Sequence, residues 1–383
     1  MVAVLGHLDV VPEGDGWSIP PYEGRVENGR IYGRGSMDDK GPTYAALYGL
    51  KAIKDSGLPM KRRVRVIFGL NEETGSEDMK YYAQHCGEFP VVGFTPDAEY
   101  PVINGEKGLL IETYGCKLEQ QPAAALRLLK LEGGTAANIV PAYAKAVFAC
   151  APALAEELAA RKAEGITCTV TAEGLTVEAE GVSAHGAMPE EGVNAIGRLM
   201  IFLNTLPLEG QLAVAVKLIA EKIGMETNGK SLGIYLYDEV SGELSNCMGV
   251  IAGDENELTV SLNYRYPVTK SVDQCRPVVQ EVFAANGFYV VDSRYDEQLY
   301  VAPESELVQK LMSVYTEYSG RNDAPKSIGG GTYAKSMPNV VAFGAIFPGD
   351  EAREHKPDEF MELSRLVDNA IIYANSIYAL AND

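Results

Sequence analysis

The sequence predicts an α/β protein of two domains, in which a mixed sheet flanked by helices carries an inserted α+β domain. First, 383 residues, 46% of them hydrophobic, are more than one ordinary core needs. Second, strand-like and helical runs alternate from residue 2 to about 105 and again after 298. Third, the stretch between them has the alternating pattern of an antiparallel sheet. We therefore expect a split first domain, residues 1–106 and 299–383, and an inserted domain, residues 107–298.

The first part of the split domain contains three apolar runs that are typical of buried parallel strands. These runs are Val2–Leu5, Val64–Leu70 and Val91–Thr95. Pro42 near a start and Gly57 past an end mark a helix between the first two strands. A second helix is expected to begin at Thr74, with Glu77 completing a capping box.

The inserted segment has strand periodicity followed by a helical pattern. Threonines at 167, 169 and 171 alternate with apolar neighbours, and Glu173–Gly174 predicts a hairpin turn before a strand at Leu175–Gly181. A helix over Asn194–Leu206 is expected to cover one face of this antiparallel sheet.

The α/β pattern returns near the C-terminus. Ser305–Ser319 is predicted to be a helix that ends at Gly320. Val340–Phe347 has the pattern of a strand, and Glu359–Leu380 that of a long amphipathic helix. These elements complete the split domain.

Composition excludes several classes of partner. Lys and Arg total 33 against 53 Asp and Glu, so the net charge of −20 repels nucleic acid and anionic lipid surfaces. The six cysteines form no C-x-x-C motif and are expected to be reduced. No run is long enough to span a bilayer and no signal peptide is evident, so we expect a cytoplasmic protein without membrane contact.

The first strand raises a question about the start of the chain. Val2–Leu5 is of the central, buried type and leads directly to His7. Because domains rarely open on such a strand, we expect that further sequence once preceded Met1. The alternative is that the chain simply begins with a strand.

Histidines and carboxylates gather in loops that follow predicted strands. His7 and Asp9 follow the first strand and point to the same side at its carboxyl end, where α/β proteins bind ligands. An adjacent carboxylate can accept the second ring N–H of a metal-bound histidine. On its own, however, an H-x-D pattern is common and usually structural.

Two carboxylate pairs extend this pattern. Asp38 and Asp39 lie in a glycine-rich loop before a helix, where one carboxylate can bridge two cations or simply cap the helix. Glu72 and Glu73 follow the second strand, so one can bind metal while its neighbour serves as a base toward water. A solvated acidic turn is the alternative for this pair.

Asp97 follows the third strand, and His355 lies in a polar loop near the C-terminus. Together these residues predict two divalent cations about 3.5–4 Å apart, with Asp38 between them. Zn²⁺ is the first choice, with Mn²⁺ or Co²⁺ as alternatives.

The motifs G-H-L-D-V-V-P, Y-G-R-G-S-M-D-D-K-G, N-E-E-T-G-S-E and P-D-A-E-Y-P resemble the metal-binding motifs of the M20 metallopeptidases, and in particular the PepV-type (Xaa-His, carnosinase-like) dipeptidases. The resemblance runs from residue 2 to the C-terminus and implies a zinc-peptidase-like catalytic domain with an inserted lid. It also implies a cis peptide between Asp38 and Asp39.

The resemblance also implies a role for each motif residue. One cation is assigned to His7, Asp38 and Asp97, and the other to Asp38, Glu73 and His355. Glu72 becomes the general acid/base, and Asp9 orients His7.

In the lid, His185 is implied to stabilise the oxyanion, while Asn138 and Arg265 contact the substrate, Arg265 at its carboxylate. Gly330 and Gly331 are implied to add backbone N–H donors. From the residues alone, Arg265 can equally be a surface residue, Asn138 a turn former and the glycines a bend. His85 has no motif around it and is expected to be structural, on a helix.

The predicted function is hydrolysis of unblocked dipeptides by water that Glu72 activates, with the lid closing over the substrate. The partner is therefore a small peptide, and the long insert resembles that of enzymes that work as monomers. One alternative is an M20-type deacylase or desuccinylase of N-acylated amino acids. Others are an inactive, truncated metal-binding homologue and a structural binding protein.

Overall fold

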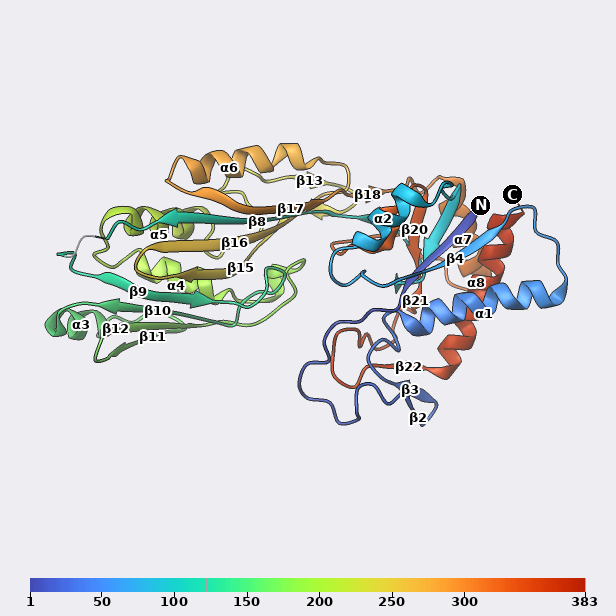
Figure 1. The fold of residues 1–383 in the computed structure, drawn as a ribbon, viewed down its shortest axis with the longest axis horizontal. Coiled ribbons are helices and arrows are strands. Elements are labelled where there is room, and N and C mark those ends of the chain that lie inside the picture. Colours follow the sequence, from blue (N-terminus) through green and yellow to red (C-terminus); the bar gives the residue numbers. More distant parts are fainter. Residues whose placement is uncertain (121–122, 383) are drawn as a thin grey trace. The chain divides into compact units, whose positions relative to one another are not determined.

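The computed structural model describes residues 1–120 and 123–382 and divides into two compact units. Unit 1 combines Met1–Glu106 with Leu299–Asp383, and unit 2 is Lys107–Gln298. In Figure 1 the blue start and the red end of the chain accordingly belong to the same unit. The predicted α/β fold class, a helix-flanked mixed sheet with an inserted α+β part, is confirmed.

The sheet of unit 1 has the strand order β18-β7-β20-β5-β1-β4, and β19 pairs with β7. Its strands are β1 (Val2–His7), β4 (Val64–Gly69), β5 (Val92–Thr95), β7 (Val102–Glu106), β18 (Leu299–Tyr300), β19 (Lys326–Ile328) and β20 (Val340–Phe343). Strand β1 lies parallel to both β4 and β5, and all six of its residues are buried. The apolar run at the start of the chain is therefore an inner strand.

The helices described in unit 1 are α1 (Lys40–Ser56), α2 (Glu77–His85), α7 (Glu306–Ser319) and α8 (Leu363–Ala381), with the 3₁₀ turn η3 (Tyr333–Ser336). As predicted, α1 and α7 end at glycines in the left-handed conformation, Gly57 and Gly320. Helices α1 and α8 cross closely at Gly49, where an added Cβ would lie 2.8 Å from the carbonyl oxygen of Ala370. Short strands complete the unit, namely β2 (Arg25–Glu27), β3 (Arg30–Tyr32), β6 (Ala98–Glu99), β21 (Ala345–Ile346) and β22 (Phe360–Glu362).

Three predicted element bounds in unit 1 are wrong. Helix α2 begins at Glu77 and has no capping box, because the Asn71 side chain bonds the Thr74 hydroxyl and accepts the Glu77 N–H at 2.9 Å. Helix α8 begins at Leu363, because residues 360–362 pair with β3 instead. The strand after residue 340 is broken at Gly344, whose φ of 75° separates β20 from β21.

Unit 2 is built on an eight-stranded sheet with the order β11-β12-β10-β9-β15-β16-β8-β17 and antiparallel pairing. Its strands are β8 (Gly108–Lys117), β9 (Arg127–Gly133), β10 (Tyr143–Ala149), β11 (Ile166–Val170), β12 (Gly174–Glu180), β15 (Ser245–Gly253), β16 (Glu257–Tyr266) and β17 (Tyr289–Asp296). The predicted hairpin joins β11 to β12, closed by reciprocal backbone bonds between Thr171 and Gly174.

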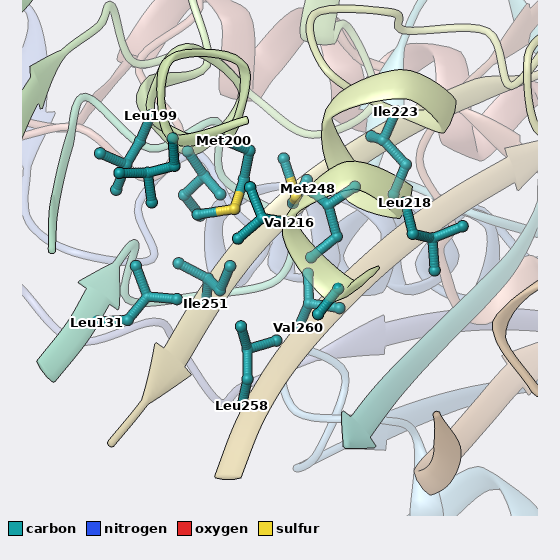
Figure 2. Close-up of a cluster of buried hydrophobic side chains, with 14 of the residues drawn as sticks. Leu131, Leu199, Met200, Val216, Leu218, Ile223, Met248, Ile251, Leu258 and Val260 are labelled. Carbon is teal, nitrogen blue, oxygen red and sulfur yellow. The ribbon is translucent and has the colours of Figure 1, made fainter. Parts of the chain in front are cut away.

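The core of unit 2 lies between this sheet and the helices that pack on it. Figure 2 shows Leu199 and Met200 of α4 (Ala195–Leu203) and Val216 of α5 (Gly210–Lys222), with sheet residues such as Ile251 and Val260 in the same cluster. Each such side chain contributes roughly 1.5–3 kcal/mol when fully buried. Asn194 caps α4 by accepting the Gly197 N–H at 3.1 Å, so the helix predicted from this residue is present.

The remaining elements of unit 2 are α3 (Pro152–Ala159), α6 (Arg276–Ala284), β13 (Tyr237–Asp238), β14 (Gly242–Glu243) and the 3₁₀ turns η1 (Pro189–Glu191) and η2 (Val272–Gln274). In the part of the chain that the structure describes, no helix is long and apolar enough to cross a membrane.

Candidate metal centre

The candidate centre lies where strands of the unit 1 sheet end. His7 is the last residue of β1, Glu72 and Glu73 follow β4, and Asp97 follows β5. Because these three strands are parallel, their carboxyl ends meet at one edge of the sheet. The loop before α1 brings Asp38 to the same place.

Asp38 lies between two imidazoles. His7 Nε2 is 2.9 Å from Asp38 Oδ1, and His355 Nε2 is 2.9 Å from Asp38 Oδ2. His7 Nε2 is also 3.8 Å from Asp97 Oδ2, and His355 Nε2 is 3.3 Å from Glu73 Oε2. The contacts thus divide into two ligand groups that share Asp38.

Glu72 reaches the same cluster. Candidate ligand atoms of Glu72, His7 and Asp97 all lie within 4.8 Å of one another, as do those of His7, Asp38 and Glu73. By position alone Glu72 could be a further ligand or a base next to the ligands. Neighbouring Glu73 makes the closer contact with His355.

The imidazoles and the shared carboxylate shift one another's pKa values. Burial by itself lowers the pKa of His7, but the hydrogen bond with Asp38 and the charge of Asp97 raise it to about 11. Hydrogen bonds with Asp38 and Glu73 raise the pKa of His355 to about 10. Burial raises the pKa of Asp38, but its bonds with the two histidines outweigh burial and bring it below its ordinary range.

The pKa values of two further carboxylates of the cluster, Glu72 and Asp97, shift in the opposite direction. Burial, followed by the charges of Glu73 and Asp38, raises the pKa of Glu72 to about 8, although His7 opposes the shift. Burial likewise raises the pKa of Asp97 well above its usual range. Converging carboxylates with two imidazoles are a donor set that suits divalent cations, whose charge would offset this repulsion. The residues therefore fit a pair of metal ions.

Asp9 holds the strand end in place through more contacts than the one predicted. Its carboxylate accepts the backbone N–H groups of Glu72 and Glu73, each at 3.2 Å. His7 Nδ1 lies 3.4 Å from this carboxylate and 3.0 Å from the backbone oxygen of Asp9. With Nδ1 directed to these oxygens, Nε2 faces Asp38 and is available to a cation.

Asp39 is a site residue to which the sequence assigned no separate role. Its fully buried carboxylate accepts the backbone N–H of His7 at 3.2 Å and the Thr43 hydroxyl at 2.7 Å. Burial raises its pKa to about 7. Its position directly after Asp38, across the cis peptide that was expected here, was the only signal in the sequence.

The loop with Gly330 and Gly331 precedes a firmly held residue. Thr332 donates its backbone N–H and its hydroxyl to the buried carboxylate of Glu106, at 3.0 and 2.7 Å. Next to it, Tyr333 packs against β4 so closely that a Cβ at Gly69 would lie 2.2 Å from the Tyr333 hydroxyl. Glu106 and Tyr333 were not singled out from the sequence.

Unit 2 carries the other three predicted residues. The loops of Asn138 and His185 lie side by side, because Gly186 donates its N–H to the Asn138 carbonyl at 2.7 Å and Ile139 pairs with His185. Arg265 lies on β16 opposite Ser245, and burial lowers its pKa to about 10. The alternative that Arg265 is a surface residue is therefore excluded, because its side chain is buried.

His85 lies outside the cluster. It is the last residue of α2 and is exposed, and its ring stacks on Tyr81 with 4.0 Å between centroids. This agrees with the structural role expected for it.

Comparisons with known proteins identify the family. Residues 3–379 match the model of peptidase family M20/M25/M40. The chain is 36% identical over 392 residues to the protein YtjP of Bacillus subtilis, covering 100% of this chain and 83% of the relative. It is 33% identical over 393 residues to the β-Ala-Xaa dipeptidase of Lactobacillus delbrueckii subsp. lactis, covering 100% and 82%.

Among solved structures, the fold is similar to the M20 family metallo-carboxypeptidase Sso-CP2 from Sulfolobus solfataricus, with a TM-score of 0.59 and 14% identity over 99% of this chain and 84% of the other. That likeness concerns the fold alone, whereas the family match covers nearly the whole chain. The chain therefore belongs to peptidase family M20/M25/M40 and is an enzyme that hydrolyses peptide bonds.

Proposed function

We propose that this enzyme is a dipeptidase that depends on two divalent cations and uses Glu72 as its general acid/base. The observation that carries the proposal is the Asp38 carboxylate, whose two oxygens each lie 2.9 Å from an imidazole Nε2. One carboxylate with an imidazole on each side is an arrangement that suits a bridged pair of cations.

These contacts support the ligand sets that the family resemblance implies. His7, Asp38 and Asp97 would hold one cation, and Asp38, Glu73 and His355 the other. Zn²⁺ is the proposed metal, and Mn²⁺ and Co²⁺ suit the same nitrogen and oxygen donors. When bound, such cations supply Lewis acidity that polarises the scissile carbonyl and makes a nearby water more acidic.

Glu72 is proposed to move the proton. Its carboxylate lies beside the ligand groups, and no ligand role is needed for it once Glu73 serves the second cation. A carboxylate oxygen of Glu72 would take a proton from the attacking water and deliver it to the leaving amine nitrogen. Burial supports this role, because desolvation raises the pKa of a carboxylate toward the range that a general base needs.

Asp9 is proposed to position both the metal ligand His7 and the two glutamates, Glu72 and Glu73. It directs Nδ1 of His7 and accepts the N–H groups that fix the backbone of Glu72 and Glu73. Short peptides are the proposed substrates, in line with the name of the Lactobacillus relative.

Unit 2 is proposed to supply His185 as oxyanion stabiliser and Asn138 and Arg265 as substrate contacts. Two observations within this unit support the proposal. The loops that carry His185 and Asn138 are hydrogen-bonded to each other. Burial leaves Arg265 a poorly hydrated cation. In unit 1, the backbone N–H groups of Gly330 and Gly331 are proposed to donate hydrogen bonds to the substrate. We accordingly assign catalysis to residues 1–106 and 299–383 and the lid to 107–298.

We also propose that the enzyme is monomeric and cytoplasmic. All six cysteines are free thiols, which suits a reducing compartment. Light scattering of the purified protein should give the mass of one chain, about 41.3 kDa, and a dimer would contradict the monomer.

The test is hydrolysis of a panel of unblocked dipeptides, each paired with its N-acetylated form. The protein is first stripped with a chelator and then supplied with Zn²⁺, Mn²⁺ or Co²⁺. We expect cleavage of the free dipeptides only, lost on chelation and restored by metal. Cleavage of the N-acylated compounds alone would instead identify a deacylase. A folded, metal-loaded protein that cleaves neither would overturn the proposal.

A further inference from the structure

A carboxylate outside the ligand set holds the loop that carries Asp38. Glu359 is fully buried, and its Oε1 accepts the backbone N–H groups of Met37 at 2.8 Å and Asp38 at 3.2 Å. Its Oε2 accepts the N–H of Gly35 at 3.1 Å. A single side chain thus binds three backbone donors of the loop, including that of the shared ligand.

Arg34 anchors this carboxylate from the other side. Its Nη1 lies 2.8 Å from Glu359 Oε2, and both side chains are buried. The guanidinium also donates to the carbonyl oxygens of Lys356 at 3.2 Å and Glu13 at 2.9 Å. The Gly33 N–H donates to the backbone oxygen of Glu359 at 2.9 Å.

These bonds join the two loops that contribute Asp38 and His355. The ligands are more than 300 positions apart in the sequence, yet Glu359 lies four residues after His355 and binds the backbone of Asp38 directly. A change in the Arg34–Glu359 pair would therefore alter how the two ligand-bearing loops are aligned.

We propose that Glu359 is a positioning residue for the metal centre, which places the Asp38 carboxylate against His355 so that both can hold the same cation. This inference rests on the dinuclear site proposed above. Polar groups behind the ligands commonly orient them and tune metal affinity. Glu359 acts here through the backbone of the ligand loop, with Arg34 fixing the position of its carboxylate through the buried ion pair.

Two variants separate positioning from simple support of the fold. Glu359→Asp keeps the charge opposite Arg34 but withdraws the carboxylate by one methylene from the three N–H groups. Glu359→Gln keeps the length but places an amide NH₂ where one oxygen accepted hydrogen bonds. The matched control is Glu362→Gln, on the same segment, where a partly exposed carboxylate pairs with Arg30 at 3.2 Å.

The experiment is a Co²⁺ titration of the metal-free, folded full chain against a competing chelator. Wild type and Glu362→Gln are expected to bind two Co²⁺ ions with equal affinity. In Glu359→Asp and Glu359→Gln the weaker-bound ion is expected to lose about 10–100-fold in affinity. Should Glu359→Gln fail to fold, Glu359→Asp decides the matter, because it retains the buried ion pair.

The outcomes distinguish this inference from the proposed function. A wild-type protein that does not bind two Co²⁺ ions would refute the dinuclear site itself. Two ions in wild type, held with unchanged affinity by a folded Glu359→Asp variant, would overturn only the positioning role. A double-mutant cycle adds a check, since Glu359→Asp should have little further effect on affinity once Asp38→Asn is present.

Discussion

The hydroxyl of Tyr333 donates a hydrogen bond to the carboxylate of Asp78, with 2.7 Å between the two oxygens. The same Asp78 oxygen accepts the N–H of Leu70 at 2.7 Å, and the Tyr333 oxygen accepts the N–H of Asn71 at 3.2 Å. Leu70 and Asn71 directly precede the proposed base, Glu72. Two side chains outside the ligand set therefore fix the backbone on which this base is carried.

Tyr333→Phe should destabilise the fold, because it leaves the Asn71 N–H without its acceptor. We expect the free energy of unfolding to fall by about 1–3 kcal/mol, measured by urea denaturation. Tyr318→Phe is the control, since this exposed hydroxyl bonds Asp368 at 2.6 Å on the surface. Equal losses in the two variants would contradict a special role for the buried hydroxyl.

Glu72→Gln should separate metal binding from turnover. The amide has nearly the same shape but cannot take a proton, so kcat should fall by about 10²–10⁴ while the metal content stays at that of wild type. Metal analysis and dipeptide hydrolysis on the same sample measure both. Glu77→Gln, a nearby substitution on α2, should retain activity. If Glu72→Gln kept most of its turnover, the proposed base would be wrong.

Asp9→Asn should weaken metal binding. An amide has one acceptor oxygen where the carboxylate serves two backbone N–H groups, those of Glu72 and Glu73. We expect about 10–100-fold lower Zn²⁺ affinity in competition with a chelator. Asp15→Asn, at an exposed position of the following loop, should bind like wild type. An unchanged Zn²⁺ affinity in Asp9→Asn would show that Asp9 does not contribute to metal binding.

Asp238 of unit 2 offers a test of pH dependence that involves none of the proposed metal ligands. Burial raises the pKa of Asp238, but hydrogen bonds from Ser241 and Thr269 outweigh it and bring the pKa below its ordinary value of 3.8. A lowered folded-state pKa adds stability that is present above the unfolded value and disappears as pH falls through the folded value.

Asp238→Asn should therefore lower the free energy of unfolding at pH 7, by about 1–3 kcal/mol. The difference in free energy of unfolding between the variant and wild type should become smaller below pH 3.8. Urea denaturation at several pH values measures it, with exposed Glu239→Gln as the control. A difference that does not change with pH would show that the charge of Asp238 plays no part.

Single residues such as proline and glycine correctly predicted the helix bounds that depend only on residues nearby in the sequence. Pro42, Gly57 and Gly320 act within one helical turn, so α1 and α7 end where expected. The start of α2 was wrong because Asn71, six residues earlier, supplies the acceptor that a capping box would have provided. The start of α8 was wrong because residues 360–362 pair with β3, which no local pattern reveals.

The candidate site shows the same division. His7, Glu72 and Asp97 were predictable as neighbours because each follows a strand of one parallel sheet. Asp39 and Glu359 act through bonds to the backbone of His7 and of Asp38. Any residue offers such a backbone partner, so the role of Glu359 leaves no pattern in the sequence, and that of Asp39 leaves only its position after Asp38.

The position of His355 so late in the chain has a consequence for biosynthesis. His7 leaves the ribosome before unit 2, but His355 and Glu359 follow only after the whole of unit 2 has been made. Since chains fold as they emerge, a nascent chain cannot assemble the proposed ligand set until unit 2 has been made. Products that terminate within unit 2 would lack the second imidazole of the proposed ligand set.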